Sequence, residues 1–310
     1  MIQQTLQLGE PREQRGIVVT ALFPRRTPVA AYLTLDEALP RGLRITEVSD
    51  DGSVPELAVA NPLDERVLLY DGEELVGAKQ NRILNVTVLV EARSTLPIPV
   101  SCVEQGRWSR RSHLFGSAAH ASHPELRRRK AERLASAPLA RGLAQAEVWD
   151  AVHEKAARMR VESPTAANAD TFRSHSGALR ALEHAFPLEP GQCGAVLGIG
   201  DTLCLDWVSR PEAFARLWPK LRRGYLLDAL EQLDGPATHP ARIAGFLDEI
   251  ADAPRAEQRS AGLGDDVRLQ GPGVIGSGLA LAAELLQLSA FSRDENGGRA
   301  GRITRPSARR

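Results

Sequence analysis

The spacing of hydrophobic and polar positions changes along the chain and divides it into three parts. In residues 1–108, short β-branched runs alternate with turn residues, a pattern typical of strands. Strands are predicted over 17–23, 56–60, 67–70, 83–90 and 96–103. Pro97 and Pro99 cannot donate to a sheet ladder, so the last strand is expected at an edge or a bulge. Short strands at this spacing predict an antiparallel, β-sandwich-like part or a partly open barrel.

The hydrophobic spacing becomes helical in residues 109–190. A loop rich in Ser, Ala, His and Arg is expected at its start, over 109–123. Three helices are predicted after this loop, over 124–136, 142–161 and 165–185. In the second helix, Val148, Val152 and Ala156 recur at four-residue spacing, which predicts one apolar face.

Residues 191–292 return to a mixed pattern. A hairpin is predicted here with its turn at Gly200 and Asp201, a favoured two-residue hairpin signal. Two helices follow, over 211–233 and 240–250. The part closes with two alternating strands that turn near Ala283.

These three parts together predict an α+β protein. The helical middle and the mixed α/β carboxy-terminal part are expected to pack on the β-rich amino-terminal part. A chain of 310 residues is near the size at which one core stops growing, so the parts can form one compact domain. Residues 293–310 are rich in Gly and Arg and are predicted to be a disordered tail.

Charge and composition narrow the class of protein. The chain has 39 basic and 39 acidic residues, so its net charge gives no general attraction to nucleic acid or acidic membranes. No stretch approaches the roughly 18 apolar residues of a membrane-spanning helix. We therefore expect neither nucleic acid nor a membrane as a partner. The basic run 127–130 is interpreted as a solvated helix face.

The amino terminus and the cysteines predict a cytoplasmic protein. The first residues lack the basic and apolar regions of a secretory signal. The three cysteines, Cys102, Cys193 and Cys204, show no Cys-x-x-Cys spacing. Reduced thiols, buried as small hydrophobic side chains, are therefore expected.

The first candidate site is the polar stretch 71–82, in which Asp71 and Gly72 form a turn. After this turn it contains two glutamates and then four consecutive large hydrogen-bonding residues, namely Glu73, Glu74, Lys79, Gln80, Asn81 and Arg82. Carboxylates close to the two bases would stay ionised and would orient them. A ligand with phosphate, carboxylate or hydroxyl groups suits this pattern. A solvated loop with a structural ion-pair network explains it equally well.

The second candidate site is the strand end at 101–108, where a rigid scaffold can present side chains to a ligand. Glu104 and Gln105 could bind hydroxyl groups, and Arg107 could bind a phosphate or carboxylate. Trp108 could stack on a base or sugar. No neighbouring base is evident that would activate the Cys102 thiol, so packing is its favoured role.

Three further patterns carry alternatives. Glu104, paired with Glu73 or Glu74, could perform acid/base hydrolysis if their environments separate the two pKa values. Histidines at 113, 120 and 123 could bind zinc with Cys102, but the loop offers no acidic second shell, and we assign no metal ligand. The glycine-rich string 271–278 fits G-x-G-x-x-G, yet no crossover and parallel strand follow it. A loop leading into a hairpin is therefore favoured.

The two candidate stretches, 71–82 and 98–108, closely resemble the ARG and Rhodanese-Phosphatase-superfamily-associated protein domain. The similarity continues through 148–150, 163–165 and 210–221 and so covers nearly the whole chain. The resemblance implies a loose connection with NAD and ADP-ribose metabolism in bacteria. It implies no established catalytic residue and no known cofactor.

The leading hypothesis is an accessory or ligand-binding domain for a phosphorylated, nucleotide-like small molecule such as ADP-ribose. Lys79, Arg82 and Arg107 would neutralise phosphate, and Trp108 would stack on the base. Ribose hydroxyls would be bound by Glu73, Glu74, Gln80, Asn81 and Glu104. The alternatives are a hydrolase of an N-glycosidic or phosphoester bond and a protein-interaction scaffold. The sequence leaves the oligomeric state, the cofactor and any enzymatic activity open.

Overall fold

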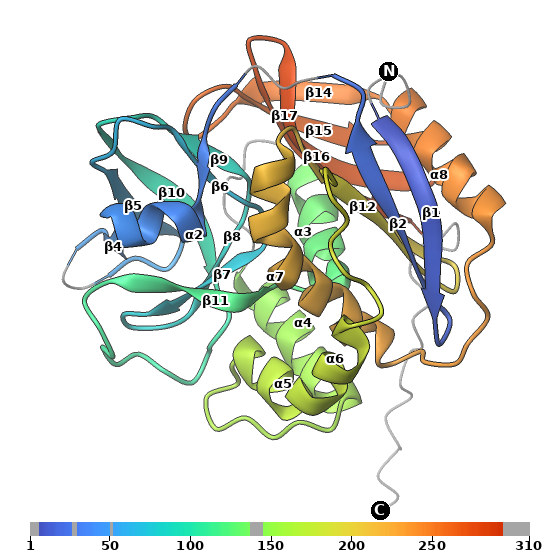
Figure 1. Ribbon diagram of the computed structural model, residues 1–310. Coiled ribbons are helices and arrows are strands. Elements are labelled where there is room, and N and C mark those ends of the chain that lie inside the picture. Colours follow the sequence, from blue (N-terminus) through green and yellow to red (C-terminus); the bar gives the residue numbers. More distant parts are fainter. Residues whose placement is uncertain (1–5, 27–29, 50–51, 137–144, 294–310) are drawn as a thin grey trace, which may run out of the picture.

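The computed structural model describes residues 6–26, 30–49, 52–136 and 145–293, and it confirms an α+β protein (Figure 1). Three β-sheets and a central group of helices make up this part of the chain. The predicted tail over 293–310 lies outside the described residues except for Arg293. None of the described helices is long and apolar enough to cross a membrane.

The largest sheet combines strands from both ends of the chain. Its order is β1-β2-β12-β13-β17-β16-β15-β14, and all neighbours are antiparallel. The strands are β1 (Leu6–Gln14), β2 (Ile17–Pro24), β12 (Gly194–Ile199), β13 (Thr202–Val208), β14 (Arg255–Arg259), β15 (Asp265–Gln270), β16 (Val274–Leu281) and β17 (Glu284–Ser292). The predicted hairpin at Gly200 and Asp201 joins β12 to β13. The glycine-rich string is not only a loop, because β16 begins within it.

Two smaller sheets share a second core. The six-stranded sheet has the order β11-β7-β8-β10-β5-β4, and the three-stranded sheet has the order β3-β6-β9. The strands are β3 (Leu33–Thr34), β4 (Arg44–Glu47), β5 (Glu56–Asn61), β6 (Val67–Leu69), β7 (Glu73–Gly77), β8 (Arg82–Leu84), β9 (Val88–Val90), β10 (Ser94–Cys102) and β11 (Phe115–Ala121). Apolar residues of both sheets, including Leu57, Leu84 and Val88, form one buried cluster.

Two predictions in this region, one of a strand and one of a loop, were wrong in part. The run 83–90 is two strands in different sheets, because the chain turns between Leu84 and Val88. The strand expected at an edge is β10. It pairs with β5 over 94–99 and with β8 only from Val100, so Pro97 and Pro99 lie in a part of β10 that has a partner strand on one side only, as the prolines predicted. Part of the loop predicted over 109–123 is the strand β11.

The described helices are α2 (Leu35–Ala38), α3 (Pro124–Ser136), α4 (Gln145–Arg158), α5 (Asn168–Ser174), α6 (Ser176–Glu183), α7 (Pro211–Ala229) and α8 (Pro240–Asp252), with a 3-10 turn at Leu39–Arg41. Some of them cover the two faces of the large sheet. Figure 1 shows α3 and α7 between the large sheet and the smaller sheets, and α8 on the outer side. The single helix predicted over 165–185 is divided at His175 into α5 and α6.

Side-chain alternation along β2 explains this layering. Ile17 and Val19 belong to the buried cluster that contains α7 residues such as Phe214. Val18 and Leu22 belong to the cluster that contains α8 residues such as Phe246. Successive strand residues point to opposite faces, so a strand that is apolar throughout needs cover on both sides. This packing places α3 and α7 beside the polar residues of the candidate site.

Candidate functional site

The polar stretch 71–82 is mostly buried. It forms the loop before β7, the strand β7, a turn and the start of β8. Glu73 is 1% exposed, and Glu74 and Arg82 are 0% exposed. Charged groups at this depth are costly unless they are paired or hydrogen-bonded. Their partners therefore decide what each residue can do.

Glu73 forms an ion pair with the central helix α7. Its Oε1 atom lies 2.7 Å from Nζ of Lys220, and its Oε2 accepts a hydrogen bond of 2.9 Å from the Tyr70 amide. Lys220 also contacts Asp36 at 2.7 Å. Burial lowers the pKa of Lys220, but Glu73 and Asp36 outweigh burial and raise it above the ordinary value. Glu73 thus connects β7 to α7 and has both oxygens engaged.

Glu74 is held by three neutral or weakly basic side chains. Oε2 lies 2.8 Å from Nδ2 of Asn168 and 3.0 Å from Nε2 of His120. Oε1 accepts a hydrogen bond of 3.3 Å from Nδ2 of Asn81. The His120 ring stacks on Phe172, with 3.8 Å between the ring centroids. Glu74 therefore joins β7 to β11 and α5.

Glu104 and Arg107 form a buried ion pair at the end of β10. Oε2 of Glu104 lies 2.6 Å from Nη2 of Arg107 and accepts a hydrogen bond of 3.1 Å from the Asn81 amide. Burial raises the pKa of Glu104, but Arg107 and the Asn81 N–H outweigh it, so the pKa lies below the ordinary value. Glu104 is therefore ionised at neutral pH and is poorly suited to act as a general acid.

The Nη1 group of Arg107 binds two backbone carbonyls. Nη1 donates to Ala78 O at 2.8 Å and to Ser109 O at 2.9 Å. Gln80 serves a similar purpose, because its Nε2 donates to Glu104 O at 2.9 Å and its Oε1 accepts from Cys102 Sγ. Arg107, Gln80 and Cys102 thus maintain the loop geometry. Cys102 is fully buried, and burial raises the pKa of its thiol.

Four residues of the two stretches gather around the exposed Trp108 ring or lie beside it, and they differ in exposure. The Trp108 side chain is 49% exposed, and Nζ of Lys79 lies 5.3 Å from its ring centroid. Cζ of Arg82 lies 5.7 Å from the same centroid. Gln105 is exposed nearby on the same loop. We call these four residues, Lys79, Arg82, Gln105 and Trp108, the Trp108 surface.

Arg82 has few partners for a buried cation. Nη1 donates to Gln80 Oε1 at 2.8 Å, whereas Nε and Nη2 make no hydrogen bond within the described part of the chain. Burial lowers the pKa of Arg82. Because Arg82 is fully buried, a ligand cannot contact it without movement of the surrounding side chains. Arg82 can still contribute its positive charge at the Trp108 surface.

The most completely buried polar cluster was missed by sequence reasoning. Arg127 of α3 forms a bidentate ion pair with Asp206 of β13, in which both N–O distances are 2.7 Å. Tyr70 and Tyr225 each donate a hydrogen bond of 2.7 Å to the same carboxylate. Ser289 of β17 donates another of 2.7 Å. We call these five residues the Asp206 cluster.

A second buried pair extends this cluster and corrects two predictions. Lys130 contacts Asp71 and donates to Leu84 O at 2.7 Å. The basic run 127–130 is therefore not simply a solvated helix face, since Arg127 is 1% and Lys130 is 3% exposed. Asp71 is more than a turn residue, because it pairs with Lys130. A charge at Asp206 inside an apolar strand was the sequence signal that could have revealed the cluster.

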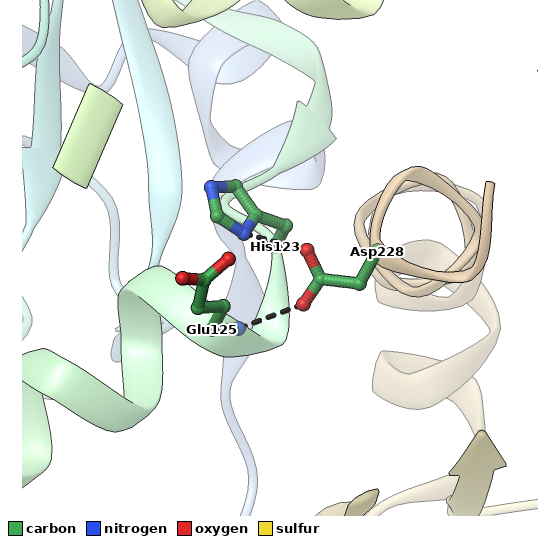
Figure 2. Close-up of side chains that lie close together, drawn as sticks. All are labelled: His123, Glu125 and Asp228. Carbon is green, nitrogen blue, oxygen red and sulfur yellow. Dashed lines mark hydrogen bonds and ion pairs between the residues drawn. The ribbon is translucent and has the colours of Figure 1, made fainter. Parts of the chain in front are cut away.

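The three histidines of the predicted loop have separate surroundings. His113 is exposed, His120 contacts Glu74, and His123 contacts Asp228 of α7. Another set could hold a metal ion in the described part of the chain, namely His123, Glu125 and Asp228 (Figure 2). One potential ligand atom from each lies within 4.8 Å of the others.

Two cavities lie outside the predicted stretches. One has a volume of about 440 Å³ and is lined by residues of α3, α4, β13 and α7, including Glu125, Arg158 and Asp228. The other has a volume of about 490 Å³ and is lined by Tyr32, Arg210 and neighbouring residues. Sequence reasoning did not identify either cavity, because their walls come from segments far apart in the chain.

The candidate stretches and the Asp206 cluster all lie in the region matched by one family. The sequence model of the ARG and Rhodanese-Phosphatase-superfamily-associated Protein domain matches residues 5–291. The chain belongs to this family. No curated protein and no solved structure shows significant similarity to the chain. Membership of the family therefore rests on the sequence model.

Proposed function

We propose that the chain is a ligand-binding domain whose Trp108 surface recognises a phosphorylated, nucleotide-like small molecule. The observation that carries this proposal is an indole ring that is 49% exposed and has the cations of Lys79 and Arg82 5.3 and 5.7 Å from its centroid. An exposed aromatic face can stack on a base, and adjacent cations attract phosphate. This combination suits a ligand that contains both groups.

The remaining predicted residues support the surface from within. Arg107, Gln80 and Glu104 fix the loop that carries Trp108 through buried hydrogen bonds. Gly52 leaves room beside the ring, because a Cβ atom there would lie 3.4 Å from Trp108 Cζ2 and 3.3 Å from Lys79 Cδ. A ring held in place loses little freedom on binding, which favours affinity. ADP-ribose fits this class of ligand, in keeping with the loose connection with ADP-ribose metabolism that the family resemblance implies.

The hydrolase alternative has weaker support. Glu73 and Glu74 are engaged in contacts that join elements, and the pKa of Glu104 is below its ordinary value. Acid/base hydrolysis by paired carboxylates needs one group that remains protonated near neutral pH. A protein-interaction scaffold is the other alternative, and the exposed indole alone would also suit it.

Fluorescence and calorimetric titrations of the full chain test the proposal. The ligands are ADP-ribose and AMP, together with adenosine, which lacks the phosphate, and ribose 5-phosphate, which lacks the base. We expect AMP and ADP-ribose to bind more tightly than either of these partial ligands, and we expect affinity to fall as ionic strength rises. Trp108→Ala should weaken AMP binding roughly 5- to 100-fold, the effect of losing one aromatic stack.

Two further variants separate charge from stacking. Lys79→Ala should weaken AMP binding but leave adenosine binding unchanged. Arg93→Ala removes an exposed arginine on another loop and should change neither. A flat response across all four ligands would reject ligand binding in favour of a scaffold. Turnover of a ligand that Glu104→Gln abolishes would favour the hydrolase.

A further inference from the structure

We propose that His123, Glu125 and Asp228 bind a divalent transition-metal ion at the wall of the 440 Å³ cavity. His123 and Glu125 flank Pro124, the first residue of α3, and Asp228 lies in the last turn of α7. One imidazole nitrogen and two carboxylate oxygens are a donor set that suits manganese, iron, cobalt or zinc. This site shares no residue with the Trp108 surface, so either proposal can fail without the other.

The state of His123 is the observation that points to a ligand. The side chain is 1% exposed, and neither ring nitrogen makes a hydrogen bond within the described part of the chain. Nδ1 lies 2.7 Å from Oδ1 of Asp228, but the contact lacks the direction of a hydrogen bond. Buried polar groups normally have such a partner. A metal ion bound by Nδ1 would supply a partner for that nitrogen.

The arrangement in Figure 2 agrees with a shared ion. Nδ1 of His123 faces the carboxylates of Glu125 and Asp228. The Asp228 carboxylate is fixed from the other side, because Oδ2 accepts a hydrogen bond of 2.8 Å from the Glu125 amide. Donor atoms bound to one ion at about 2.1 Å lie roughly 3 Å apart, close to the separation of Nδ1 and Oδ1. Little movement is needed to bring both atoms onto one ion.

The cavity gives the ion a place for a further ligand. Glu125 and Asp228 line it, together with Arg128 and Arg158. A catalytic metal keeps at least one coordination position open for water or substrate. The two arginines would favour an anionic group in that position. The site would therefore take a small anionic ligand beside the metal ion.

Lys155 is the competing cation. Its ammonium lies 2.7 Å from Oδ1 of Asp228 and 3.7 Å from Oε2 of Glu125, and it also contacts Glu231. The described ion-pair network has four carboxylates, Glu125, Glu154, Asp228 and Glu231, against the three cations Arg129, Lys155 and Arg158. Apart from His123, this set therefore holds one more carboxylate than it holds cations. A metal ion can thus join the network, and removal of Lys155 should strengthen its binding.

Metal titration of the chelator-treated full chain tests this inference. Co²⁺ is the probe, because its visible absorption reports coordination by nitrogen and oxygen, and Mn²⁺ and Zn²⁺ are titrated by calorimetry. The wild type should bind one equivalent of Co²⁺. Glu125→Gln, at a partly exposed position, and His123→Gln should each weaken binding at least tenfold. Folding of each variant is checked by circular dichroism.

Two other variants make the test specific. His120→Gln changes a buried histidine outside the set and should retain wild-type affinity for Co²⁺. Lys155→Met should raise the affinity severalfold, an effect that a purely structural ion-pair network would not give. The proposal is overturned if the wild type binds none of the three ions at millimolar concentration. It is also overturned if His120→Gln weakens binding as much as His123→Gln does.

Discussion

The two ends of the polar stretch 71–82 have opposite surroundings. At the first end, Asp71 pairs with Lys130 and Glu73 pairs with Lys220, and all four side chains are buried. At the other end, the Arg82 guanidinium is buried without an ion pair to any described carboxylate, beneath an exposed Trp108. Buried charge is tolerated when it is paired, so the paired end serves the fold. Cationic charge without a protein carboxylate is more informative about a ligand.

The Asp206 cluster gives the strongest test of the statement that paired buried charges stabilise the fold. Arg127→Met would leave the Asp206 carboxylate buried without its cation, and we expect a loss of about 3–5 kcal/mol in the free energy of unfolding. The adjacent Arg128 pairs with Glu132 on the helix surface, and Arg128→Met should cost about 1 kcal/mol or less. Chemical denaturation of both variants measures the difference. Equal losses would show that burial of the pair does not govern stability here.

The Glu104–Arg107 pair adds a dependence on pH. Glu104→Gln should cost about 1–3 kcal/mol at neutral pH, because Arg107 would lose its charged partner. The folded pKa of Glu104 lies below the ordinary value of 4.5, so its contribution is present above pH 4.5 and is lost as pH falls through the folded pKa. Denaturation at several pH values should show a shallower acid loss in the variant.

A matched carboxylate controls for general acid effects. Glu65 pairs with Arg41 in a half-exposed position, where the two side chains are 44% and 45% exposed. Glu65→Gln should leave the acid profile close to that of the wild type. If Glu104→Gln keeps the full acid dependence, the Glu104 pair is not its source.

Elements with local signals could be predicted from the sequence. The helix expected over 124–136 is α3 with the same bounds, because proline is favoured in the first turn and apolar residues follow at helical spacing. The turn at Gly200 and Asp201 was also correct, since Gly200 adopts a φ of 54°. These features depend on residues close together in the chain.

The partners of the charged residues could not be predicted in the same way. Glu73 and Lys220 are 147 positions apart, and only the assembled fold brings β7 against α7. Without those partners, a strand that contains Glu73 and Glu74 resembles a solvated loop, which is why β7 was missed. The hypothesis from the sequence that both candidate stretches contribute to one site agrees with the structure in one respect, because Asn81 contacts Glu104. It could not distinguish the residues that maintain the loop from those that face solvent.

The smallest expected change in stability is at Arg82. This residue gives the sharpest contrast between buried charges that form ion pairs and a buried charge that does not. Arg82→Met removes a buried cation that makes no direct ion pair with a described carboxylate, and it fills a similar volume. We therefore expect a change within about 1 kcal/mol, or a gain in stability. AMP binding should nevertheless weaken, because the positive charge beneath Trp108 is lost. Denaturation and titration of the same variant measure both effects, and a loss of stability as large as that of Arg127→Met would place Arg82 among the structural pairs.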